Sequence, residues 1–204
     1  TMGNHFIFDM FFFEYEKNVT AFFSAGLFII LAVLIHQVSK MELSFKRQWR
    51  FLSFLSIFLA CDEWFSLHEQ LNSLGSFFGD LPFWLVVYVP LVLVLVLFLF
   101  PFLLKMEKRL LFRLFVAGAL FISGAVLFES INILFSKDNL FLYNLLLFFE
   151  DGLEMMGVLL AIIAIMNYLS IKGIRQIQLS KATVLVVFFL SLADLLITYF
   201  IHFI

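Results

Sequence analysis

Eight carboxylates lie within stretches of the sequence that are otherwise apolar and long enough to cross a membrane. These residues are Asp62, Glu63, Glu69, Glu129, Glu150, Asp151, Glu154 and Asp194. An acid at the centre of a membrane-spanning helix costs about 2.5–3.5 kcal/mol on insertion scales, and such residues usually mark a functional site. No lysine or arginine falls at a similar depth to pair with them. We therefore expect protons, a bound metal ion or a water-filled cavity to offset the cost.

Polar residues form a stripe on each of four expected helices when residues are placed 100° apart. The stripes are Asp62, Glu63, Ser66, Glu69 and Gln70; Gly118, Ala125, Glu129, Asn132 and Ser136; Glu150, Asp151, Glu154 and Gly157; and Ser191, Asp194, Thr198 and His202. His68 is expected about 120° away from Asp62, off the first stripe. The first and third helices carry few polar residues and are expected to be outer scaffold, with Trp84 in a packing or interfacial position. The four stripes are expected to face one another.

Carboxylates combined with imidazoles are typical ligands of Fe, Mn or Zn, whereas oxygen ligands alone suit Ca. The candidate metal ligands are Asp62, Glu63, His68, Glu69, Glu129, Glu150, Glu154, Asp194 and His202. The Glu-x-x-His spacing of four-helix di-metal proteins is absent. Glu63, Glu150 and Asp151 are the candidate catalytic groups, because a carboxylate crowded by like charges can exchange protons as a general acid or base.

Three functions are compatible with this acidic site. The first is a metal-dependent membrane enzyme, a hydrolase or an oxidoreductase, acting on a lipid-like or apolar substrate from the middle or outer half of the bilayer. The second is a divalent cation or proton transporter that uses the same acids. The membrane half without acids carries few polar residues, chiefly Ser53, Ser56, Ser123, Asn167 and Thr183, which disfavours a continuous path. The third is a membrane protein that a metal stabilises without turnover.

The elements that must position these residues are transmembrane helices. Of the 204 residues, 64% are hydrophobic and 14% charged, whereas a soluble domain has about 45–50% apolar and roughly 25% charged residues. Six stretches have the length and apolar character of bilayer spans, near 20–38, 51–71, 82–104, 110–135, 141–169 and 183–203. The sequence predicts a single all-α domain of six membrane helices, in which helices two, four, five and six surround an acidic core. Residues 1–19 are expected to form a short extracytoplasmic segment without the features of a secretory signal.

The basic residues predict the direction of the spans. All but Lys17 and Lys137 fall on one side of the predicted membrane: Lys40, Lys46, Arg47, Arg50, Lys105, Lys108, Arg109, Arg113, Lys172, Arg175 and Lys181. By the positive-inside rule this side is cytoplasmic, which places both termini outside.

The net charge, the single cysteine and three glycines indicate which partners and contacts to expect. A net charge of −2 excludes a general basic surface for nucleic acid. The single cysteine, Cys61, excludes an internal disulfide. Membrane lipids are the expected surroundings. Gly118, Gly124 and Gly157 could support close helix contacts either within the chain or in a homo-oligomer.

Overall fold

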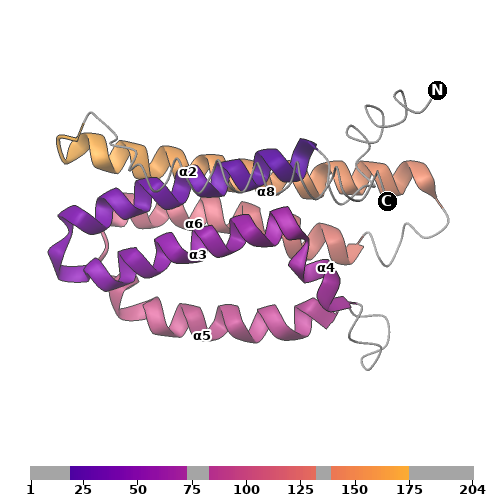
Figure 1. The fold of residues 1–204 in the computed structure, drawn as a ribbon, viewed down its shortest axis with the longest axis horizontal. Coiled ribbons are helices and arrows are strands. Elements are labelled where there is room, and N and C mark those ends of the chain that lie inside the picture. The colour runs from indigo at the N-terminus through magenta and orange to yellow at the C-terminus, as the bar shows by residue number, and fades with distance from the viewer. Residues whose placement is uncertain (1–18, 73–82, 132–138, 175–204) are drawn as a thin grey trace, which may run out of the picture.

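The computed structural model describes residues 19–72, 83–131 and 139–174, and every regular element within them is a helix (Figure 1). The elements are α2 (Val19–Met41), η1 (Leu43–Phe45), α3 (Lys46–Phe65), α4 (Leu67–Asn72), α5 (Phe83–Lys105), α6 (Lys108–Ile122), η2 (Ser123–Phe128) and α8 (Leu140–Ile171). The predicted span at 183–203 and nearly all of the segment 1–19 lie outside the described residues.

Four helices are long and apolar enough to cross a membrane, namely Ala21–Met41, Phe83–Lys105, Lys108–Ile131 and Phe141–Ile171. They coincide with the first, third, fourth and fifth predicted spans. Their outward side chains are large and apolar, for example Leu97, Phe112 and Phe115, each at least two-thirds exposed. Exposed apolar side chains on helices of this length are typical of helices that face lipid. The described part of the chain is therefore the helical part of a membrane protein, and the count of six spans stays a prediction.

The second predicted span, 51–71, is not one continuous helix. Helix α3 ends at Phe65, and Ser66 adopts a left-handed conformation with φ 47° before α4 begins. This conformation costs a non-glycine residue roughly 1–2 kcal/mol. Two hydrogen bonds to Asp62 offset the cost, one from the Ser66 amide to the backbone carbonyl and one from the His68 amide to the carboxylate. Asp62 thus ends the helix that carries it.

The fourth predicted span, 110–135, is helical from Lys108 to Ile131 but contains a wider turn. Residues Ser123–Phe128 form a π-helical segment, η2, between α6 and Glu129. Such a turn adds a residue to the helix and rotates everything after it relative to a regular α-helix.

Helix α2 packs against both α3 and α8, while α6 and η2 run along α8 (Figure 1). Two glycines allow the close approach of α6 and η2 to α8. A Cβ at Gly124 would lie 2.6 Å from the Glu150 carbonyl oxygen, and a Cβ at Gly157 would lie 2.7 Å from the Ala117 carbonyl oxygen. Both glycines therefore serve contacts within the chain, whereas a Cβ at Gly118 would meet nothing within 4 Å.

The basic turns meet at one end of the bundle, on the left in Figure 1. Lys172, after α8, forms an ion pair of 3.1 Å with Glu42, in the α2–α3 turn, and Tyr168 also donates a hydrogen bond to Glu42. Lys105, at the end of α5, lies 5.9 Å from the ring centre of Phe45. We refer to this region as the basic end. Which face of the membrane it occupies stays a prediction.

Candidate functional site

A cavity of about 890 Å³ lies between α2, α3, α5, α6 and α8. Its apolar wall includes Leu55 and Phe58 of α3, Val92 and Leu95 of α5 and Phe121 of α6. Its polar wall lies further from the basic end along each helix and consists of Ser24, Asp62, Glu63, Ser66, His68, Trp84, Tyr88, Glu129, Tyr143, Glu150, Asp151 and Glu154. The cavity is therefore amphipathic along the bundle axis.

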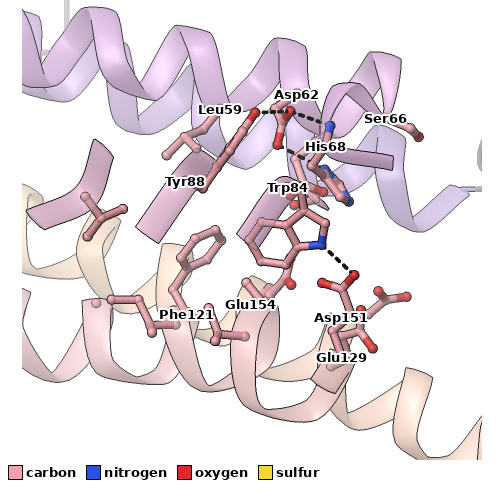
Figure 2. Close-up of a pocket in the computed structure, with 18 of the residues that line it drawn as sticks. Leu59, Asp62, Ser66, His68, Trp84, Tyr88, Phe121, Glu129, Asp151 and Glu154 are labelled. Atoms are coloured by element: carbon pink, nitrogen blue, oxygen red, sulfur yellow. Dashed lines mark hydrogen bonds and ion pairs between the residues drawn. The ribbon is translucent and has the colours of Figure 1, made fainter. Parts of the chain in front are cut away.

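Asp62 has both carboxylate oxygens in contact with donors in the cavity wall (Figure 2). Its Oδ1 accepts hydrogen bonds from the His68 amide at 3.1 Å and from the Tyr88 hydroxyl at 2.9 Å. Its Oδ2 lies 3.0 Å from His68 Nδ1. The residue is only 6% exposed. Both oxygens of Asp62 are therefore engaged with His68 and Tyr88.

His68 lies beside Asp62, and the expected separation of about 120° is wrong. The left-handed residue Ser66 breaks the helix and turns α4 back, so the 100° rule does not apply across it. The His68 ring also packs edge-on against Trp84, with 6.0 Å between ring centres.

Helix α5 contributes to the cavity directly, and its expected role as outer scaffold is incomplete. Trp84 donates a hydrogen bond from Nε1 to Glu129 Oε1 at 2.8 Å, and Tyr88 binds Asp62 (Figure 2). These two donors are four residues apart and so share one face of the helix. That spacing in an otherwise apolar helix is the sequence signal that could have identified them.

Helix α8 presents three acids to the cavity, Glu150, Asp151 and Glu154. The Glu154 carboxyl interacts electrostatically with each of the acids Glu63, Glu129, Glu150 and Asp151. Glu63, in turn, interacts with Asp62, His68 and Asp151. The close contact at Gly124 holds η2 against the backbone of Glu150 and Glu154, which keeps Glu129 near them.

Seven of the residues predicted for the site therefore line one cavity: Asp62, Glu63, His68, Glu129, Glu150, Asp151 and Glu154. The Glu69 side chain, Asp194 and His202 lie outside what the structure describes. Among the described residues, no three His, Cys, Asp or Glu side chains stand close enough together to hold a metal ion. In this arrangement the carboxylates line the cavity on several sides and do not converge on one metal position.

Two irregular backbone segments border the cavity. Ser66 is the only non-glycine residue with positive φ in the described part of the chain, and it lines the cavity. The π-helical segment Ser123–Phe128 contributes Ala125 and Val126 to the wall. Backbone strain and π-helical turns occur preferentially at functional sites. Both departures from regular helix fall where the polar side chains gather.

The fold and the cavity define the class of protein: an all-helical membrane protein with an amphipathic cavity between its helices. Residues 4–169 match the model of a family described as a domain of unknown function (DUF8692), and the chain belongs to that family. Neither the curated proteins nor the solved structures contain a match to the sequence.

Proposed function

We propose that this protein is a membrane-embedded enzyme that binds a lipid-like molecule in the cavity and transfers protons to or from it. One observation carries the proposal: the oriented Asp62–His68 pair lies in the wall of a cavity whose remaining surface is largely apolar. Ligand pockets have volumes of about 300–1,000 Å³ and combine an apolar surface with a few oriented polar groups. At about 890 Å³ the cavity falls within this range.

The Asp62–His68 pair has the arrangement of a general base and its orienting carboxylate. In this proposal His68 donates from Nδ1 to Asp62 Oδ2 and exchanges protons through Nε2. Glu63 interacts with both members of the pair and is the nearest candidate for a second proton-exchanging group. Glu150 and Asp151, on the facing helix, complete the set of proposed acids and bases.

A substitution at Gly118 tests occupancy of the cavity. Gly118 lines the cavity and a Cβ there meets no other atom within 4 Å, so Gly118→Phe should fill the space without displacing a helix. Gly26→Phe is the matched control, because Gly26 has equally open surroundings but does not line the cavity. Mass spectrometry of the purified proteins should find a lipid-like molecule with the wild type and the control but not with Gly118→Phe. Equal recovery with all three proteins would contradict the proposed binding site.

A second variant tests the chemistry. His68→Gln should still bind the molecule but leave it unconverted, so lipid extracts of membranes containing this variant should lack a product that the wild type forms. Gln70→Ala is the control, because Gln70 is also on α4 but bonds the Phe65 carbonyl outside the cavity wall. Identical extracts from wild type and His68→Gln would contradict proton transfer by His68.

The metal-dependent form of this proposal retains a divalent ion, with Fe, Mn or Zn favoured and Ca as a further candidate. A carboxylate behind an imidazole, as in Asp62–His68, is the usual support of a metal-bound histidine. Other acids would have to move inward to complete the ligand set. Elemental analysis of the purified protein tests whether a metal ion is bound. Stoichiometric metal that is lost in the double variant Glu150→Ala, Glu154→Ala supports the metal site, and substoichiometric metal unchanged by these substitutions contradicts it.

Cation or proton transport is the second candidate, because interacting acids extend from Asp62 through Glu63 to Glu154. Three hydroxyls of the more apolar half are engaged with backbone carbonyls: Ser53 with Ala32, Ser56 with Leu52, and Ser123 with Ala119. They therefore offer no continuous chain of proton carriers. Flux into proteoliposomes that is abolished by Asp62→Asn would support transport. Absence of flux in the wild type under several ion gradients would exclude it.

We also propose that the basic end is cytoplasmic, which places both termini outside. Glu107, in the exposed turn between α5 and α6, is a suitable labelling position. With Cys61 replaced by Ser, Glu107→Cys should react with an impermeant thiol reagent only after cells are opened. Labelling in intact cells would reverse the orientation.

A further inference from the structure

We propose that the lipid-like molecule is a cationic amphiphile, with an ammonium headgroup at the acidic wall and a hydrocarbon chain along the apolar wall. This inference rests on the proposed function, because it names the class of substrate for the same cavity. Six carboxylates line the cavity, from Asp62, Glu63, Glu129, Glu150, Asp151 and Glu154. Among the described lining residues His68 is the only basic side chain, and none is lysine or arginine.

The distribution of the acids favours an organic cation over a metal ion. The acids come from α3, from the helical turn that follows η2 and from α8, so they surround the cavity on several sides. Among the described residues no three of them approach closely enough for a metal ion. A primary or quaternary ammonium group is larger, distributes its charge and carries several N–H or CH groups, and it can face several separated carboxylates at once. Carboxylates away from water are stabilised by such a counter-charge.

Aromatic rings stand beside the acids. Trp84 and Tyr88 pack edge to face with 5.8 Å between ring centres, and both line the cavity, as does Phe121 (Figure 2). Cations are attracted to aromatic faces, and aromatic side chains are a recurrent means of recognising quaternary ammonium groups. The combination of acids and aromatic rings therefore favours a positively charged headgroup over a neutral or negative one.

Ser24, on α2, adds a buried hydroxyl beside the acid Glu63. Its side chain is 3% exposed and lines the cavity, and its Oγ has no hydrogen-bond partner among the described residues. The Glu63 carboxyl interacts with it, but their contact does not meet the geometry of a regular hydrogen bond. A buried polar atom without a partner costs free energy unless a ligand or water satisfies it. An ammonium N–H placed between Ser24 and Glu63 would do so.

The apolar wall indicates the chemistry of the rest of the ligand, beyond its headgroup. Leu55, Phe58, Val92 and Leu95 line the cavity toward the basic end and offer no hydrogen-bonding side chain. Hydrocarbon burial contributes about 0.8 kcal/mol per CH₂ group. A chain attached to the ammonium group therefore has a favourable place in the cavity. A small cation such as tetramethylammonium would fill only its acidic half.

Three probes of equal chain length test the charge preference: dodecylammonium, dodecanol and dodecanoate. Each is titrated into the purified full chain in non-ionic detergent, and affinity is measured by calorimetry. We expect dodecylammonium to bind at least about tenfold more tightly than dodecanol, and dodecanoate to bind most weakly. The double variant Glu129→Gln, Asp151→Asn should reduce the advantage of the ammonium about tenfold, whereas Glu107→Gln, outside the cavity, should leave it unchanged.

Ser24→Ala is the second variant, because it removes no charge and should fold even if the double variant does not. It should weaken dodecylammonium binding severalfold and leave dodecanol binding unchanged. Equal affinities for the three probes, or an ammonium preference that survives both sets of substitutions, would overturn the inference. Ammonium-selective binding without turnover would instead contradict only the enzymatic proposal. Turnover of a neutral or acidic lipid would support the enzyme and overturn the cationic substrate.

Discussion

The two ends of the helical bundle manage polar groups in opposite ways. At the basic end, aromatic side chains fill the space between helices, and Trp49 packs on Phe102 with 5.0 Å between ring centres and on Tyr168 with 6.4 Å. The charges there lie at the periphery, where Lys172 pairs with Glu42. At the other end a cavity replaces the packed core. Its acids are held by neutral donors, Tyr88 and Trp84, and by a histidine.

This difference predicts that the two ends contribute unequally to the free energy of unfolding and to ligand binding. A filled aromatic core contributes directly to the free energy of unfolding, whereas a cavity lined with acids forgoes that packing. Functional sites tolerate such a loss because the ligand supplies the missing contacts. Loss of aromatic packing at the basic end should therefore change mainly stability, whereas loss of a hydrogen bond to a cavity acid should change both stability and binding. The following predictions test this division.

The largest expected effect is that of Trp49→Ala. Trp49 is 3% exposed and touches two other aromatic rings, so its truncation should lower the free energy of unfolding by about 3–5 kcal/mol. Phe112→Ala, at the same end but 67% exposed, should have little effect. Chemical unfolding in detergent micelles measures both. Similar stabilities of the two variants would show that the aromatic cluster does not stabilise the basic end.

The second prediction concerns the α6–α8 contact that joins the two ends. In Gly157→Ala the new Cβ would lie 2.7 Å from backbone atoms of Ala117 and Phe121, so the helices must separate. We expect a loss of about 1–3 kcal/mol, measured as a lowered unfolding midpoint. Gly152→Ala is the control on the same helix, because its Cβ meets nothing within 4 Å. Its stability should be unchanged or slightly increased, since alanine favours helix. Equal midpoints would contradict the close contact.

These two regions also show what the sequence can predict. Apolar length located the four spanning helices, because the bilayer imposes a fixed length on each. Of the predicted acids, Glu129, Glu150, Asp151 and Glu154 fall in helices that are apolar enough to span a membrane. A charge in such a segment is conspicuous in any hydropathy pattern. The position of His68 was not predictable from periodicity, since one left-handed residue, Ser66, changes the direction of every residue after it. Trp84 and Tyr88 were missed because their apolar rings resemble packing residues while their polar atoms bind the acids.

The third prediction compares one kind of hydrogen bond at the two ends. Tyr88→Phe removes the bond to buried Asp62, and Tyr168→Phe removes the bond to Glu42. Hydrogen bonds to charged groups contribute about 1.5–3 kcal/mol. Tyr88→Phe should approach this cost, because Asp62 is only 6% exposed. Tyr168→Phe should cost less, because Glu42 keeps Lys172 and some contact with water. Unfolding midpoints of the two variants give the comparison, and the reverse order would contradict it.

The smallest expected effect is the pH dependence contributed by Glu42. The hydrogen bond from Tyr168 and the charge of Lys172 hold the pKa of Glu42 below its ordinary value of about 4.5. A carboxyl with a lowered pKa in the folded state stabilises that state above its unfolded pKa, and loses this contribution as the pH falls through the folded value. The wild type should therefore exceed Glu42→Gln in stability by up to about 1 kcal/mol near neutral pH.

That difference should shrink as the pH falls below about 4.5 and also as salt concentration rises, because the pair with Lys172 lies near the surface and is screened. Unfolding midpoints of both proteins across this pH range provide the measurement, with Glu107→Gln as an exposed control at the same end. The comparison of variants isolates Glu42, because the acids of the cavity are common to both proteins and cancel. A difference that stays constant with pH would mean that Glu42 contributes through packing, and the basic end would then owe its stability to its aromatic core alone.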